Sequence, residues 1–419
     1  MPPAHGSSLV TSQRAPAITI GVRSKLANFF EQNRFLLTFA VLASLMGTTV
    51  GMAQVSASLY AVHLGSSQAM LGLIAGSQSV GVLLMSLPIG LLVDRFGPAR
   101  PFVVGTLLAG LSYAVLPLWA TPSWLLACTA AISFFMPLRF VSLNTVFLQQ
   151  LASLGEAKAG WYRGTHMLGM FLVGPALGAR AISSLGFAWT YRLISLGFFV
   201  TIFVSPIVFA RYARAPESKR APGWQVLRSQ LTWLANDREL RAVSLIEGVT
   251  QAVSAFFVFF IVVMAVSVVH LSSAQASSLV AAKGTTFIVA LFILGGLIKR
   301  LGQHRAYMVG FAAIASALAM LGFAGSAPLL WIGSLTLGVG LGAVQIATLT
   351  RYAQIGARDG YGKVSGLSAL VGPSGGLFGS LFGGLLSKWV GLPGTFAIAA
   401  AGFALGLLIL ATRQVARAR

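Results

Sequence analysis

The chain has 419 residues, of which 56% are hydrophobic and only 9% are charged. An ordinary soluble domain has about 25% charged residues, and a soluble fold of this length could not cover so much apolar surface. The composition therefore excludes an ordinary soluble protein and predicts an integral membrane protein.

The first 33 residues are polar and include Arg14, Arg23 and Lys25. They lack the compact apolar core and the small-residue cleavage site of a secretory signal peptide. We predict that residues 1–33 form a loose cytoplasmic tail and that the first apolar run directs insertion into the membrane.

Twelve apolar runs follow, each near the length of about twenty residues that a helix needs to cross a bilayer. Such runs are helical, because within lipid each span must satisfy its own backbone hydrogen bonds. The predicted helices cover residues 35–62, 70–93, 102–120, 123–148, 164–184, 189–210, 242–268, 277–298, 306–325, 328–350, 364–387 and 394–412. Six precede a polar central loop, 211–241, and six follow it, before a short tail, 413–419.

Positive charge is distributed unevenly over the predicted loops. The side that holds both termini carries 24 of the 29 lysines and arginines, whereas the opposite side has only Lys388 clearly in a loop. By the positive-inside rule, both termini and the central loop are predicted to be cytoplasmic. Membrane topology thus accounts for the net charge of +21, and no nucleic-acid partner is expected.

The central loop itself is predicted to contain an amphipathic helix on the inner membrane surface. Apolar residues between Gln225 and Leu234 recur at helical spacing beside Trp224 and Trp233. For the first half of this loop, a flexible linker is an equally good interpretation.

Two eleven-residue segments, 90–100 and 295–305, are near copies that lie 205 positions apart. Gly, Leu, Arg, Gly and Arg recur in register, and each segment closes a long apolar run. Upstream, segment 63–69 matches segment 270–276 at an offset of 207, which indicates a two-residue insertion or deletion between the blocks. A chain whose halves repeat in this way is organised like a secondary transporter.

The first copy resembles the signature that the major facilitator superfamily carries between its second and third helices. The matching residues are Gly90, Leu92, Asp94, Arg95, Gly97 and Arg100. The resemblance extends over about residues 34–412 and implies that Asp94 and Arg95 form a charge lock that opens as the transporter changes state. Because the second copy has Lys299 in place of the aspartate, this gating role falls chiefly on the first copy. The alternative is an ordinary exposed ion pair, worth less than about 1 kcal/mol.

A second family pattern is partly present in the predicted fifth helix. Gly174, Pro175 and Gly178 match the core of a glycine–proline motif that resembles the one associated with proton antiporters that export solutes. The full glycine spacing of that motif is missing. A helix bend that serves packing alone explains these residues about as well.

Polar and ionisable residues inside the spans are the candidates for the substrate site, because such groups are costly in hydrocarbon and usually face a cavity or a partner. Arg139 and Lys283 lie in opposite halves of the chain and could together hold an anionic group. The remaining candidates could hydrogen-bond a hydroxylated or amide-bearing solute. They are Gln54, Asn144, Gln251 and Gln345.

Coupling to a proton gradient needs a group that titrates under working conditions. Glu247 is the only carboxylate within a predicted span, and His166 is the second candidate because the reference pKa of histidine is about 6.5. The alternative for Glu247 is a structural ion pair with Arg241 or Lys283.

We therefore predict an all-α inner-membrane protein with twelve transmembrane helices in two pseudo-symmetric six-helix bundles, 34–210 and 242–412, around a central cavity. The first hypothesis for its function is export of a small organic solute by proton antiport. The alternatives are import of a sugar or organic anion by symport or facilitated diffusion, and a sensor or assembly protein that moves no solute. We expect a monomer without enzymatic activity, metal or other cofactor, whose partners are the substrate, the proton gradient and the lipid bilayer.

Overall fold

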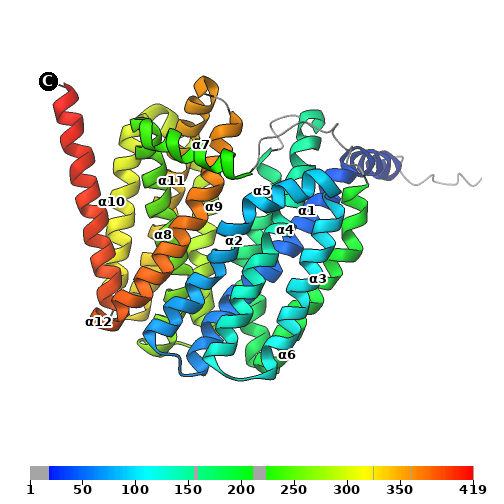
Figure 1. Cartoon of the computed structure of the whole chain (residues 1–419), viewed down its shortest axis with the longest axis horizontal. Helices are drawn as coiled ribbons and strands as arrows, with labels where there is room; N and C mark the ends of the chain where they lie inside the picture. Colours follow the sequence, from blue (N-terminus) through cyan, green and yellow to red (C-terminus); the bar gives the residue numbers. More distant parts are fainter. Residues whose placement is uncertain (1–17, 155–158, 211–222, 324, 360, 419) are drawn as a thin grey trace, which may run out of the picture.

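The computed structural model describes residues 18–154, 159–210, 223–323, 325–359 and 361–418, and the regular elements within them are all helices (Figure 1). In chain order these are α1 (Ile18–His63), α2 (Gln68–Phe96), α3 (Ala99–Val115), η1 (Leu116–Leu118), α4 (Pro122–Leu154), α5 (Ala159–Leu168), the π-helix η3 (Gly169–Val173), α6 (Gly174–Phe209), α7 (Gly223–Asn236), α8 (Arg238–Ser267), α9 (Ser273–Leu301), α10 (Gln303–Gly322), α11 (Ala327–Asp359) and α12 (Tyr361–Ala418).

The helices form two groups that lie side by side. In the first group α1 packs against α6, while α2 and α3 pack against α4; in the second, α11 packs between α9 and α10, and α12 packs against α8 and α10. Ten helical segments of the described chain are long and apolar enough to cross a membrane, but two of them have 46 and 43 residues. Each of these two is bent back on itself, at Gly186 and Gly391, so the described part of the chain makes twelve crossings.

Four glycines in unusual backbone conformations make the sharp turns of both halves. Gly97 and Gly302 end α2 and α9 with φ of 78° and 81°, and Gly186 and Gly391 bend α6 and α12 with φ of 76° and 72°. A side chain at this φ, combined with an extended ψ, is strained, so these turns require glycine. The members of each pair are 205 positions apart, which gives the repeated glycine of the sequence motif a physical cause.

The structure assigns a different register to the segments before α2 and α9. Ser67 and Ser272 are the N-caps of these helices and have nearly identical backbone angles, so they are structural equivalents 205 positions apart. The offset of 207 proposed for segments 63–69 and 270–276 is therefore wrong. Each serine side chain accepts a backbone N–H at its helix start, and Gly65 and His270, which have φ of 66° and 57°, are also 205 positions apart. The identities at the offset of 207 pair neither these caps nor these turn residues.

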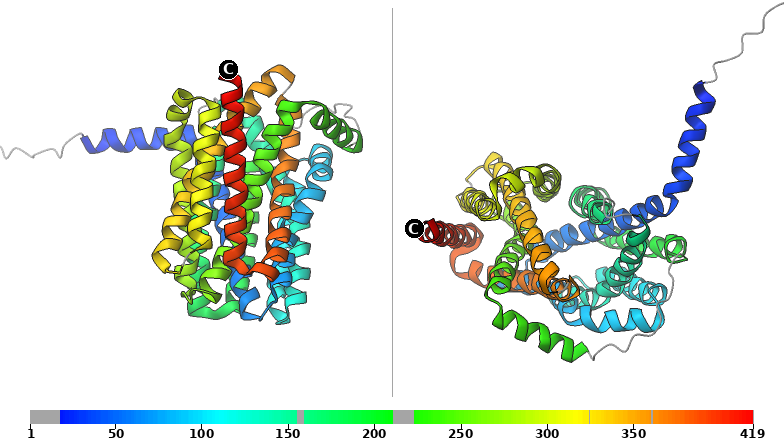
Figure 2. Two further views of the ribbon diagram at one scale, coloured as in Figure 1. Left: turned by 90° about the vertical axis from the view of Figure 1, so that its left-hand side faces the viewer. Right: turned by 90° about the horizontal axis from the view of Figure 1, so that it is seen from above.

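Both ends of the described chain are more helical than the sequence indicated. Residues 18–33 were expected to form a loose tail but continue α1, and residues 413–418 continue α12. The segment 18–33 has apolar residues at positions 22, 26, 29 and 30, which is the spacing of one helix face. Figure 2 shows that this part of α1 leaves the bundle sideways.

The helix predicted within the central loop is confirmed. Residues 225–234 lie within α7, and its Trp233 and Leu234 pack against a small apolar cluster that includes Leu240 and Tyr352. The first half of the central loop, 211–222, lies outside the described residues.

The two ends of the bundles differ in charge. One end, which we call the basic side, holds α7, the turns at Gly97 and Gly302, and exposed arginines such as Arg100 and Arg305. The other end, the opposite side, holds the turns at Gly186 and Gly391. In Figure 1 the basic side is at the top.

Candidate functional site

The two bundles meet tightly near the opposite side. There α2 runs along the first half of α12, and a methyl group on Gly72 would lie only 2.7 Å from Cα of Gly384. One helical turn further out, Ser387 Oγ donates a hydrogen bond of 3.3 Å to Gln68 Oε1. Backbone contact without side chains between the helices closes the molecule at this end.

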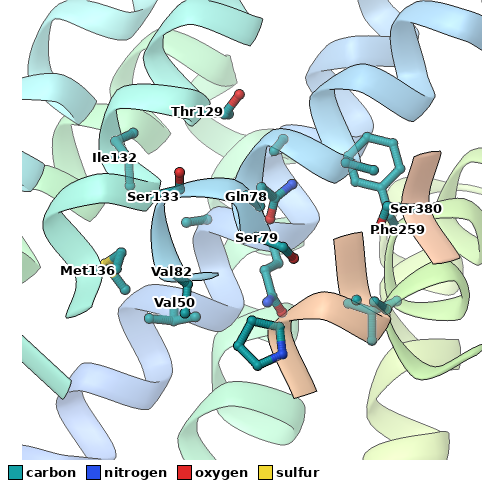
Figure 3. Close-up of a pocket in the computed structure, with 18 of the residues that line it drawn as sticks. Val50, Gln78, Ser79, Val82, Thr129, Ile132, Ser133, Met136, Phe259 and Ser380 are labelled. Atoms are coloured by element: carbon teal, nitrogen blue, oxygen red, sulfur yellow. The ribbon is translucent and has the colours of Figure 1, made fainter. Parts of the chain in front are cut away.

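Behind this closure lies a cavity of about 340 Å³ between the bundles, which we call the central cavity. Gln78 and Ser79 of α2 and Ser133 of α4 face Phe259 of α8 and Ser380 of α12 across it (Figure 3). Its lining mixes amides and hydroxyls with aromatic rings and methionines. Such a wall suits a small solute that has both a polar and an apolar part.

A second cavity of about 720 Å³ continues from the central cavity toward the basic side, and we call it the inner cavity. Four residues line both spaces, so the two cavities adjoin, and we call them together the path. They are Phe140, Phe171, Gln251 and Ser254. The α2–α12 contact closes the path near the opposite side. The central cavity reaches close to that end, since its lining includes Leu116, directly after α3, and Tyr191, five residues after the turn at Gly186, whereas the inner cavity lies in the half next to the basic side.

Most of the candidates chosen from sequence line this path. Gln54 lines the central cavity and Gln251 lines both cavities. The others line the inner cavity: Asn144, His166, Glu247, Lys283 and Gln345. Helices from both bundles therefore contribute polar groups to one space, as the path of a solute between two bundles requires.

Lys283 is a buried cation that lines the inner cavity, with 1% of its surface exposed. Its Nζ donates a hydrogen bond of 2.8 Å to Ser254 Oγ and lies 4.7 Å from the ring centre of Phe171 and 5.7 Å from that of Phe287. Phe171 belongs to η3 in the first bundle, whereas Lys283 belongs to α9 in the second. The ammonium group thus lies at the bundle interface, held by one hydroxyl and two aromatic faces.

Glu247 is the carboxylate of the inner cavity and is buried on α8. The Tyr352 hydroxyl interacts with both the Glu247 carboxyl group and Ser244 Oγ, the latter at 3.2 Å. His166, across the cavity, has its Nδ1 3.1 Å from the Ala43 carbonyl oxygen, and its ring packs edge-on against Phe140. The two proton-coupling candidates therefore face one space from different bundles.

Arg139 lies elsewhere, in contrast to the expectation that it binds substrate. Its side chain is completely buried in the first bundle and lines neither cavity. The guanidinium lies 3.9 Å from the ring centre of Phe198, and Nη2 donates to Thr201 Oγ1 at 3.2 Å. The ring centres of Phe198 and Tyr113 are 5.1 Å apart, and Tyr113 lines the central cavity. Arg139 therefore lies one layer behind the cavity wall.

We expect Arg139→Ala to destabilise the folded protein without changing the affinity for solute by more than about twofold. Within the described residues, Nε and Nη1 of Arg139 have no hydrogen-bond partner, and truncating a large buried side chain costs about 2–5 kcal/mol. Arg139→Met should retain most of the stability, because apolar groups of similar volume often replace buried charges without loss. Thermal melting in detergent and ligand titration measure the two effects separately. A tenfold weaker affinity in both variants would return Arg139 to the substrate site.

Comparison with known protein families decides the class of this molecule. The family model described as Major Facilitator Superfamily matches residues 37–269 and 243–418. The chain belongs to the major facilitator superfamily. It is a multi-pass membrane protein of a transporter family, in agreement with the loop motif. No curated protein matches the chain by sequence.

Solved structures show the same fold at low sequence identity. A mutant of the nucleoside transporter NupG aligns with a TM-score of 0.78 and 12% identity over 90% of this chain and 99% of that one. A POT family transporter in complex with 5-aminolevulinic acid aligns at 0.74 and 11%, over 90% and 96%. A bacterial homologue of the human lysosomal transporter Spinster, inward-facing and unoccupied, aligns at 0.64 and 15%, over 90% and 94%.

The loop motif of this superfamily member is described only in part. The Asp94 side chain lies outside the described residues. Arg95 is exposed and its guanidinium lies 5.2 Å from the ring centre of Phe96, and Arg100 is also exposed. A side chain on Gly90 would meet no neighbour, whereas Gly97 is needed for its backbone angle. The charge lock therefore stays a prediction, and the turn at Gly97 has a structural reason.

The glycine–proline segment of the fifth crossing packs against α1. Methyl groups on Gly169 and Gly174 would overlap the backbone of α1 near Ser44 and Thr48, and one on Gly178 would lie 3.2 Å from Cα of Met52. The π-helix η3, which ends two residues before Pro175, presents Phe171 to Lys283. The segment of the fifth crossing that packs closely against α1 is therefore also the segment that is a π-helix and contacts the second bundle.

Sequence reasoning missed the two tyrosines of the central cavity, Tyr113 and Tyr191. Their rings are stacked 6.4 Å apart, and within the described residues the Tyr191 hydroxyl has no hydrogen-bond partner. In an apolar run, tyrosine is ordinarily a packing residue, so it attracts no attention. Gln78 could have been found, because it is a polar residue about ten positions into the second span.

Proposed function

We propose that the chain exports a small organic anion with an apolar part, in exchange for protons, by alternating access of the path between its bundles. The basic side is cytoplasmic in this proposal, because lysines and arginines accumulate on the inner side of membrane proteins. The protein then lies in the inner membrane with both termini in the cytoplasm, and the described conformation faces inward.

The observation that carries this proposal is that one path holds both Lys283 and Glu247. These residues line the inner cavity together with amide side chains, and the path is closed at the opposite side. A buried ammonium group favours an anionic ligand, and the aromatic rings around it favour an apolar part next to that charge. The carboxylate on the neighbouring helix supplies a group that can take up a proton.

Screening the purified protein by thermal shift against a broad library of solutes is the first experiment. A ligand that binds the folded state raises its apparent stability by mass action, so carboxylates and phosphates with a ring or chain are expected among the hits. Everted membrane vesicles then test direction, because an exported solute is taken up when a proton gradient is imposed. The export proposal is contradicted if no hit shows gradient-dependent uptake in such vesicles.

The Glu247→Gln variant tests the coupling. We expect it to lose proton-driven accumulation of the solute by at least about tenfold, because the amide cannot carry a proton between the two sides, while solute exchange without a gradient continues. Transport and proton movement in proteoliposomes measure both. Glu239→Gln is the matched control, since Glu239 pairs with Arg351 at 2.7 Å on the basic side and lines neither cavity. Unchanged coupling in Glu247→Gln would move the proton site to His166 or elsewhere.

Import of an organic anion by symport is the second candidate, and Lys283 supports it equally well, since a cation in the path does not depend on direction. Deletion of the gene should then abolish growth on one anionic nutrient. A sensor without flux would instead bind a hit in the thermal-shift screen and fail to move it across liposomes.

A further inference from the structure

A third space lies away from the solute path, between α8 and the two halves of α12. It is a groove of about 1170 Å³, and we call it the lateral groove. Its walls include Phe256 of α8, Phe378 and Phe382 of the first half of α12, and Phe403 of the second half. Phe378 and Phe382 are 64% and 50% exposed, so the groove belongs to the outer face of a membrane protein.

Glycines and internally bonded hydroxyls make the lateral groove smooth and apolar. Gly375 and Gly379 lie against the backbone of α8, and a side chain on Gly402 would meet no neighbour within 4 Å. Ser374 Oγ donates to the Leu370 carbonyl at 2.7 Å, and Thr395 Oγ1 donates to the Gly391 carbonyl at 2.8 Å. The hydroxyls therefore offer little to a polar ligand, and the groove suits hydrocarbon.

Among the described residues one charged side chain lines the groove, Arg241, at its end on the basic side next to Leu234 and Ala235 of α7. From Arg241 to Phe256, fifteen helical steps of α8 span about 22 Å, which exceeds the roughly 15 Å of hydrocarbon in one leaflet. On α12 the lining continues from Leu367 to Leu386, nineteen helical steps or about 28 Å, so the groove is long enough to hold a single lipid, with its cation at the end on the basic side and its aromatic walls along the acyl chains.

The acidic side chains near Arg241 are already paired. Glu239 accepts from Arg351 at 2.7 Å, and Asp237 pairs with Arg358 at 3.1 Å. Arg358 also pairs with Asp359 at 2.8 Å. Within the described residues, the Arg241 guanidinium has neither a hydrogen bond nor an ion pair. A free cation at the mouth of an apolar groove calls for an anionic amphiphile.

We propose that the lateral groove binds one anionic phospholipid from the leaflet on the basic side. Its phosphate pairs with Arg241, and its acyl chains fill the space between α8 and the two halves of α12. The bound lipid would bridge the helix that carries Glu247 and the helix that closes against α2, without entering the solute path.

Native mass spectrometry of the detergent-purified full-length protein tests this proposal with phosphatidylglycerol and phosphatidylcholine of identical chains. We expect one phosphatidylglycerol retained in preference to phosphatidylcholine, and a preference that is about fivefold weaker in Arg241→Gln, which is the effect of one arginine near an anionic surface. Arg238→Gln is the matched control, since Arg238 is exposed three residues away and does not line the groove.

Gly402→Leu fills the groove and should reduce retention of both lipids, whereas Ala401→Leu, on the exposed neighbour outside the groove, should not. An unchanged preference in Arg241→Gln would overturn the proposal, as would equal losses in both leucine variants, which indicate loosely bound annular lipid. Light scattering that shows a dimer in the wild type and a monomer in Gly402→Leu would assign the groove to a second copy of the chain and overturn it as well.

Discussion

Lys283→Met is expected to weaken binding of the anionic solute by about 10- to 150-fold, the largest effect of any single side chain in the path. A hydrogen bond to a charged group contributes about 1.5–3 kcal/mol, and each 1.4 kcal/mol is a factor of ten in affinity. The fold should survive, because methionine fills a similar volume and relieves the burial of a charge. Titration of purified protein with the solute found by thermal shift measures the change.

Two further variants separate charge from packing at this position. Lys283→Arg keeps the charge and the contact with the Phe171 ring, so we expect it to recover part of the affinity. Lys388→Met removes an exposed lysine on the opposite side, where Nζ lies 5.9 Å from the ring centre of Trp389, and should leave binding unchanged. If Lys283→Met binds the solute within twofold of the wild type, the anion site lies elsewhere and the substrate class proposed above fails.

The fold could be predicted from the sequence because the dominant constraint is local. Each crossing must satisfy its own backbone groups and cover about 30 Å of hydrocarbon, so the length of an apolar run reveals it. The positions of Gly186 and Gly391 follow in the same way, since they fall between predicted spans. The helical extension at residues 18–33 was missed because its apolar face is too narrow to register in a search for continuous apolar runs.

The candidate site could be predicted only from the positions of polar residues within the predicted spans. Lys283, Glu247 and Gln251 were chosen as candidates because polar groups within a span are rare and usually face a partner, and all three line the inner cavity. Arg139 satisfied the same criterion, yet its face of α4 turns toward Phe198 and Thr201 within the bundle. Which face of a helix meets the other bundle depends on how the helices pack together. The position of a polar residue within its own span does not determine that face.

The closure near the opposite side depends on the packing of two glycines, which no local pattern reveals. Gly384→Leu is expected to prevent this closure and to lower transport by at least about tenfold. A methyl group there already overlaps the backbone of Gly72, and overpacking typically costs about 1–3 kcal/mol. That cost is comparable to the few kcal/mol that separate the conformations of a two-state protein, so the variant favours the state that opens this end.

Transport in proteoliposomes and thiol labelling together test the Gly384→Leu prediction. Ser387 is buried in the closed state, and its hydroxyl bonds to Gln68. A cysteine introduced as Ser387→Cys should therefore react with a membrane-impermeant maleimide only when this end is open. We expect slow labelling in the otherwise wild-type protein and fast labelling when Gly384→Leu is added. Leu385→Phe, on an exposed neighbour in the same helix, controls for added bulk. Slow labelling with normal transport in Gly384→Leu would mean that α2 and α12 do not form the gate, and the inward-facing assignment would lose its basis.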